Sequence, residues 1–285
     1  MTTATGEKPT STEPLSTSAI ITVQRKKSKK RGRTGMIVGI QIALVLALLG
    51  IWELVSGTLV PEILLSRPSK VLPLFWQWII DGTLLTNAAS TFSGALWGLL
   101  IGGLAGIIVG AILGQSKILA DIFEPFITAL YTMPKHALIP LFIMWVGIGS
   151  MLGIVTSAVI VFFLVFFNTF FGMKDVRQSL IDSVRIMGGS PWDVMFRVRL
   201  PSALIWVVAA LKLAVPQAVV GVVVAEMLAG DSGLGYLVAH NAGMFNSAGT
   251  FSALIALLIA GYLIDRLMTW VTKKPLAWKN NNSTS

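Results

Sequence analysis

The chain has 285 residues, of which 54% are hydrophobic and 12% are charged. A soluble domain usually carries about 25% charged residues, so the composition excludes an ordinary soluble protein and predicts an integral membrane protein. Apolar segments near the length of a membrane-crossing helix predict that it is all-α. The sequence contains no cysteine, which excludes a disulfide framework, a thiol catalyst and a cysteine-based metal site.

The net charge of +9 is unevenly distributed, with seven basic residues in one block, 25–33, directly before an apolar run. This placement is typical of a cytoplasmic flank under the positive-inside rule, so no nucleic-acid partner is expected. Residues 1–35 are predicted to form a disordered, basic, cytoplasmic N-terminus that acts as a topology anchor or also contacts anionic membrane lipid. A cleaved signal peptide is excluded because the basic region begins late and no small-x-small site follows.

Six apolar segments are near the length of about 20 residues that a helix needs to cross a bilayer. They are predicted at 36–55, 88–114, 118–146, 152–171, 203–228 and 250–271. Pro134 and Pro140 are expected to break the third segment. The chain is thereby divided into a first span with a periplasmic segment (36–87), a core (88–272) that includes a polar loop (173–201), and a cytoplasmic tail (273–285).

The second span carries a glycine at every fourth position: Gly94, Gly98, Gly102, Gly106, Gly110 and Gly114. Each step of four residues drifts by about 40° around a helix, so the glycines form a groove that winds around it. Small residues let membrane helices approach closely, and the series therefore predicts helix packing rather than chance tolerance of glycine.

Several polar residues fall inside the predicted spans: Lys135, His136, Lys212, Gln217 and Glu226. Charges at membrane depth are costly, so they either pair with carbonyls and neighbouring helices or line a translocation path. The residues alone leave both alternatives open. The two histidines, His136 and His240, lack metal-ligand spacing, and no metal site is predicted.

The polar loop is predicted to form two short helices joined by a turn. Gly188-Gly189 ends the first helix, as glycine does at C-termini. Ser190 caps the second, with Pro191 at its first position and Asp193 three residues after the cap. Pro201 is expected to end the segment. An ordered helix–turn–helix between two spans indicates a docking surface.

This loop resembles the signature loop of ABC-importer membrane subunits, in which a glycine is followed after nine residues by an aliphatic residue and then, one residue later, by Leu-Pro. The matching residues are Gly188, Val198, Leu200 and Pro201, while Asp182-Ser183-Val184 stands where the family has Glu-Ala-Ala. Two further stretches resemble the nitrate/sulfonate/taurine branch of the family: 133–149, which begins Met-Pro-Lys-His, and 224–236, which ends Ser-Gly-Leu-Gly-Tyr. The resemblance covers roughly residues 60–275.

The resemblance implies a type I ABC importer permease fold with six transmembrane helices in the cell inner membrane. It implies a permease subunit that moves a small solute, such as a sulfonate, nitrate or taurine-like anion. Further implied partners are a periplasmic or lipid-anchored solute-binding protein and a second copy in a homodimer. A pair of separate ATPase subunits would dock on a coupling loop that contains Asp182, Ser183, Val184, Gly188, Gly189, Val198, Leu200 and Pro201.

No enzymatic activity or cofactor is expected in this chain, because the sequence lacks a phosphate-binding Gly-x-x-x-x-Gly-Lys-Ser/Thr motif. The alternative is an ion-coupled secondary transporter, which usually shows repeated halves and mid-membrane carboxylates. Here the acidic residues fall near span ends and no clear inverted repeat is visible. A membrane-embedded enzyme is a more distant alternative.

The distribution of basic residues predicts the orientation. With a cytoplasmic N-terminus, 16 basic residues flank the spans on the inside: seven in the N-terminal block, one at Lys117, five in the polar loop and three after the last span. The outside segments hold two, Arg67 and Lys70. Under the positive-inside rule this bias puts the polar loop in the cytoplasm.

Overall fold

The computed structural model describes residues 28–273, and the side chains of residues 35–269. It divides into two compact units, with the boundary between Val55 and Ser56. The described part of the first unit is a single helix, α2 (Ser28–Val55). Its apolar side chains are exposed all around the helix, which is typical of a segment that lies in lipid.

Helix α2 begins at Ser28, earlier than the predicted Met36. The prediction of disorder for residues 28–35 was therefore wrong, because lysine and arginine are good helix formers and extend the apolar helix toward its N-terminus. The rest of the predicted N-terminus, and the predicted tail beyond Lys273, lie outside the described residues.

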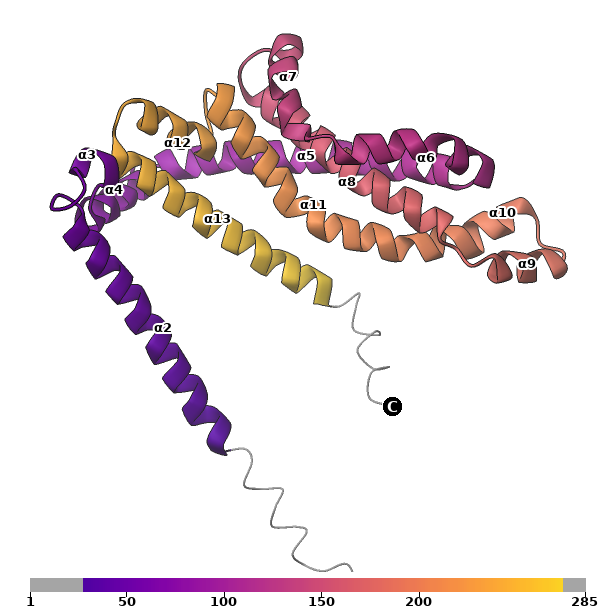
Figure 1. The fold of residues 1–285 in the computed structure, drawn as a ribbon, viewed down its shortest axis with the longest axis horizontal. Helices are drawn as coiled ribbons and strands as arrows, with labels where there is room; N and C mark the ends of the chain where they lie inside the picture. Colours follow the sequence, from indigo (N-terminus) through magenta and orange to yellow (C-terminus); the bar gives the residue numbers. More distant parts are fainter. Residues whose placement is uncertain (1–27, 274–285) are drawn as a thin grey trace, which may run out of the picture. The chain divides into compact units, whose positions relative to one another are not determined.

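The second unit is helical, and its described residues contain no strand (Figure 1). Its elements are α3 (Glu62–Leu65), α4 (Pro68–Ile80), α5 (Thr83–Gly114), α6 (Lys117–Thr132), η1 (Lys135–Leu138), α7 (Ile139–Val146), α8 (Ser150–Lys174), α9 (Gln178–Ile186), α10 (Pro191–Val194), η2 (Met195–Arg199), α11 (Leu200–Ala229), α12 (Leu234–Gly243) and α13 (Ser247–Lys273).

Five stretches of the described chain are long and apolar enough to cross a membrane; four of them contain α2, α5, α8 and α13, and the fifth contains α11 together with its flanking helices. A sixth span results if α6 and the η1–α7 segment, bent by 84° relative to each other, count as one. The break at Pro134 was predicted correctly. Pro140 makes no break, since it lies in the first turn of α7, where its missing N–H has no helical partner to lose.

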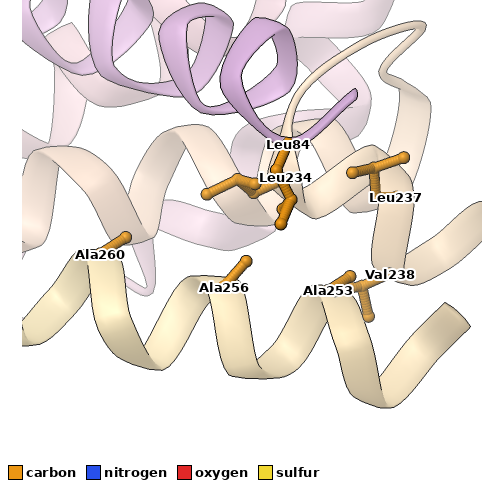
Figure 2. Packing of buried hydrophobic residues seen from close by; sticks show 7 residues of the cluster. All are labelled: Leu84, Leu234, Leu237, Val238, Ala253, Ala256 and Ala260. Carbon is orange, nitrogen blue, oxygen red and sulfur yellow. The ribbon is translucent and has the colours of Figure 1, made fainter. Parts of the chain in front are cut away.

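Helices α5, α8 and α11 lie side by side and form the centre of the second unit (Figure 1). The polar loop, with α9 and α10, lies at one end of this group and α12 lies at the other. Beside α12, a cluster of leucine, valine and alanine side chains joins α5, α12 and α13 (Figure 2). Three alanines of α13 face this cluster, and their small size lets α12 pack closely.

The regularly spaced glycines of α5 are all buried. A Cβ at Gly106 would lie 2.8 Å from the carbonyl oxygen of Phe162, and one at Gly110 would lie 2.9 Å from that of Phe166, both on α8. At the far end of the series, Gly94 faces Val222 of α11 instead. The groove therefore receives the backbone of α8 along most of its length.

Candidate functional site

The two arms of the polar loop are held together by a small apolar core. Ile181 of α9 packs with Val194 of α10 and Val198 of η2, and all three side chains are buried. Val176 and Val184 complete the cluster from its edge. The aliphatic position of the signature, Val198, is thus a packing residue that gives the loop a fixed shape.

The two glycines of the turn are needed for different reasons. Gly188 has a φ of +82° and open space around it, so only its backbone conformation disfavours a side chain. Gly189 would place a Cβ 2.8 Å from the carbonyl oxygen of Val184, to which its own N–H donates a hydrogen bond. The turn therefore disfavours β-branched and most other side chains at Gly188 through its backbone, and has no room for a side chain at Gly189.

The start of α10 has the capping arrangement that the sequence predicted. The Asp193 N–H donates to Ser190 Oγ at 3.2 Å, and the Ser190 N–H donates to the Asp193 carboxylate at 3.0 Å. The Ser190 hydroxyl also donates to this carboxylate, at 2.7 Å, and the two hydrogen bonds from Ser190, first that from the hydroxyl, lower the pKa of the Asp193 carboxyl. Arg197 pairs with the same carboxylate at 3.2 Å. The cap fixes the direction in which the chain leaves the turn.

Pro201 does not end the segment, contrary to the sequence prediction, because the helix continues from α10 through η2 into α11. The turn before the proline has the wider π geometry, in which the Leu200 N–H donates to the carbonyl oxygen of Met195. A proline within an α-helix clashes with the carbonyl four residues before it, and the wider turn avoids that clash.

The tip of the loop exposes large apolar side chains. Ile186 and Met187 are 86% and 78% exposed, and Trp192 stacks on Phe196 with ring centroids 5.7 Å apart while 71% of it stays exposed. The acidic side chain of the signature, Asp182, accepts a hydrogen bond from Gln178 at 2.9 Å within α9. An apolar tip on an otherwise polar loop is a typical protein-binding surface.

The polar residues predicted inside the spans have unequal surroundings. Lys135 Nζ donates to the carbonyl oxygen of Tyr131 at 2.5 Å and lies 5.5–5.8 Å from the rings of Tyr131, Phe163 and Phe167. Its position supports the carbonyl-pairing alternative, because α6 ends at Thr132 and leaves that carbonyl without a helical partner.

Lys212 and Gln217 of α11 and His136 of η1 are exposed in the single chain. Within the described residues, no hydrogen bond or ion pair joins these three side chains to one another or to Lys135. Their predicted place on a translocation path stays a prediction.

Glu226 lies in a buried polar cluster between α5, α11 and the start of α12. Its side chain is 7% exposed, and both carboxylate oxygens lie 2.9 Å from the hydroxyl of Thr91, itself fully buried. The Gly235 N–H donates to the same carboxylate at 2.9 Å, and the Leu234 N–H donates to Thr91 Oγ1 at 2.9 Å. These contacts favour a structural role for Glu226 over the predicted role on the path.

Two features of this cluster escaped the sequence reasoning. Thr91 and Asn87 of α5 supply its partners, and the Asn87 side-chain oxygen accepts from the Gly233 N–H at 2.7 Å. Gly233 and Gly235 have no room for a Cβ beside the Glu226 side chain. The Ser-Gly-Leu-Gly stretch was the available signal, since two glycines around a helix start indicate a close approach.

Comparison with known proteins identifies the family to which this chain belongs. Residues 102–276 match the model of the family described as "Binding-protein-dependent transport system inner membrane component". The SsuC permease protein of Bacillus subtilis (strain 168), named for aliphatic sulfonates transport, is 28% identical over 90% of this chain and 92% of its own. The nitrate import permease protein NrtB of Synechococcus elongatus is 30% identical over 78% of this chain and 84% of its own.

A solved structure gives the same fold. A chain of the MetNI methionine ABC transporter in inward-facing conformations matches with a TM-score of 0.51 and 22% identity, over 69% of this chain and 97% of that one. Together, the helical architecture, the signature loop and these matches show that the chain belongs to the binding-protein-dependent inner-membrane components of ABC importers, in their nitrate/sulfonate branch.

Proposed function

We propose that this chain is the permease subunit of an ABC importer for a small anion, and that a separate ATPase subunit docks on the loop 173–201. Two copies would line one path, and a solute-binding protein would deliver the solute at the opposite face. ATP binding to the ATPase pair would move the loop, and the loop would move the spans into which it continues.

The observation that carries the proposal is the form of the loop. A rigid helical hairpin, closed by Gly188 and capped by Ser190, presents exposed Ile186 and Met187 at its tip. A connector between two spans needs neither a buried core nor an apolar tip. Both are expected of an element that inserts into a cleft of another protein and transmits its movement.

The test separates the shape of the turn from the stability of the protein. Gly188→Val should leave the protein in the membrane and abolish solute-stimulated ATP hydrolysis and co-purification with the ATPase subunit, since a β-branched residue resists a φ of +82°. Gly188→Asn is the matched control, because asparagine tolerates that conformation far better. Normal coupling in the valine variant would show that this loop is not the docking element.

Support for an anionic solute comes from two sources. SsuC is named for aliphatic sulfonates and NrtB for nitrate, whereas RibX of Chloroflexus aurantiacus, 29% identical over 82% of this chain and 90% of its own, is named for riboflavin. The second source is the cationic character of the predicted path. Basic side chains in a pore favour anions, and Lys212 is the better candidate because Lys135 already pairs with the Tyr131 carbonyl.

The solute is tested in the reconstituted complex with its binding protein. Sulfonates or nitrate should stimulate ATP hydrolysis more strongly than cationic or neutral solutes of similar size. Lys212→Gln should reduce anion uptake while leaving basal ATP hydrolysis intact, and Lys135→Gln serves as the comparison, since its loss removes a carbonyl partner instead. Stimulation by cationic solutes alone would contradict the anion proposal without affecting the docking proposal.

A further inference from the structure

A pocket with a volume of about 330 Å³ lies where the polar loop meets the ends of two spans. It is formed by α9, α10, η2 and the residue that follows α5. The residues that line it are Gln115, Arg185, Pro191, Trp192, Val194, Met195 and Arg199. Its lining does not include Ile186, Met187 or Gly188, but it does include Trp192, whose ring is also exposed at the tip of the loop.

Positive charge in this pocket is uncompensated. Arg185 and Arg199 are close enough for their charges to repel each other. The Nε of Arg199 is buried and has no hydrogen-bond partner among the described residues. The nearby carboxylate of Asp193 is engaged by Ser190 and Arg197, and the pocket lining contains no acidic residue. A buried donor without a partner is costly and indicates a missing acceptor.

The pocket lies at the depth where lipid headgroups are found. Gln115 directly follows the last residue of α5, and Arg199 directly precedes the first residue of α11. Both helices are apolar and longer than the hydrocarbon layer is thick, so we expect these ends to lie at or just outside one of its boundaries. Trp192 precedes Arg199 by seven residues in the same helix, so its exposed indole lies about 10 Å beyond this boundary on the loop side.

We propose that this pocket binds the phosphate group of an anionic membrane lipid. The two guanidinium groups would hold the phosphate oxygens, and the unpartnered Nε–H of Arg199 would gain an acceptor. The stacked rings of Trp192 and Phe196, which lie on the loop side of Arg199, would contact the headgroup alcohol beyond the phosphate. The lipid would neutralise the paired arginines at the base of the loop. This site requires only that the span ends lie at a membrane surface, so it stands independently of the transported solute.

The experiment uses the full-length protein, purified, delipidated in detergent and titrated with phosphatidylglycerol or phosphatidylcholine. Native mass spectrometry measures the number of bound lipids and their apparent affinity. The wild type should retain phosphatidylglycerol at least about tenfold more tightly than phosphatidylcholine, given about 1 kcal/mol for each basic residue near an anionic surface and the added hydrogen bonds. Arg185→Gln/Arg199→Gln should remove this preference.

The matched control, Arg177→Gln/Arg197→Gln, removes the same charge from loop residues that do not line the pocket and should keep the preference. Arg185→Gln alone changes an exposed residue and should fold. A reduced preference for phosphatidylglycerol in this single variant supports the site even if the double variant fails to fold. Arg199→Lys, which retains the charge, should bind phosphatidylglycerol more tightly than Arg199→Gln.

Three results would overturn the proposal. The first is an equal loss of preference in the control variant. The second is displacement of phosphatidylglycerol by millimolar inorganic phosphate, which would mean that the pocket takes a free anion. The third is an unchanged lipid preference in the pocket variant combined with weaker ATPase binding, which would assign the arginines to acidic groups of the ATPase.

Discussion

Neighbouring glycines of α5 have contrasting surroundings. Gly102 faces α8 so closely that a Cβ would lie 2.9 Å from the carbonyl carbon of Ala158 and 3.0 Å from its Cα. Gly103, one residue later, has its nearest atoms at 3.8 and 3.9 Å, on Leu211 and Val161, which is ordinary contact. Adjacent positions in one helix thus differ in whether a methyl group fits.

This contrast gives a matched pair of variants. Gly102→Ala should lower the free energy of unfolding of the purified protein by about 1–3 kcal/mol, because α5 and α8 must separate to admit the methyl group. Gly103→Ala should be neutral or raise the stability by up to about 1 kcal/mol, because alanine is the better helix former. Thermal unfolding in detergent measures both, and equal effects at the two positions would contradict the packing described for α5 and α8.

The buried carboxylate of Glu226 makes a second prediction at the same scale. Glu226→Ala leaves the Thr91 hydroxyl and the Gly235 N–H without their acceptor, at a cost of about 1–3 kcal/mol for each group. Asp231→Ala, which removes an exposed acid five residues away, should change stability little. Thermal unfolding compares the unfolding temperatures of the two variants. Unfolding of Glu226→Ala at the wild-type temperature would rule out the structural role of the cluster.

The residues that could be predicted from the sequence are those whose partners lie close to them along the chain. Gly188, Ser190 and Asp193 act within five residues of one another, so turn and capping rules were enough to place them. Glu226 and Thr91 are 135 residues apart, and no local rule relates them. The contact of Lys135 with the Tyr131 carbonyl was likewise one of two alternatives in the sequence. It depends on the end of α6 at Thr132, which the sequence alone did not fix.

At the scale of elements, hydrophobic length located the five stretches that could each cross a membrane and the third segment, which the structure divides into two parts bent by 84°. The ends of the helices shifted by several residues. The shift in α2 has a local cause, because lysine and arginine extend an apolar helix. Proline was the less reliable signal, because its effect depends on the position that it takes in a turn. Pro134 follows a helix end and permits an 84° bend, whereas Pro140 and Pro201 begin helices or lie in their first turn.

The cap of α10 predicts a local loss of order. Ser190→Ala removes the acceptor of the Asp193 N–H and should cost about 1 kcal/mol. Hydrogen exchange should therefore quicken in residues 188–196 while the spans stay protected. Ser183→Ala is the control, since its hydroxyl donates only to the Ser179 carbonyl within α9. Unchanged exchange at the start of α10 would show that the cap contributes nothing to the order of the loop.

At the scale of the whole molecule, the alternation of spans predicts which face each connection occupies. The charge bias predicts that the polar loop lies inside, and an odd number of crossings from a cytoplasmic N-terminus predicts that the segment after α11 lies outside. Reporter fusions after Gly230 should read outside, and fusions after Lys174 or Lys273 should read inside. A cytoplasmic signal at Gly230 would disprove the six-span arrangement, because α11 would then not cross.

The uninterrupted helix from Pro191 to Ala229 has a mechanical consequence. Its length is about 58 Å at 1.5 Å per residue, with the capped loop at one end and Glu226 three residues from the other. Pro216 lies inside this helix, where it permits a bend, so a tilt of about 5° at the loop displaces the far end by at most about 5 Å, roughly one helical turn. A displacement of that size would strain the hydrogen bonds between Glu226, Thr91 and Gly235. The strength of these hydrogen bonds therefore determines how much of the displacement reaches α12.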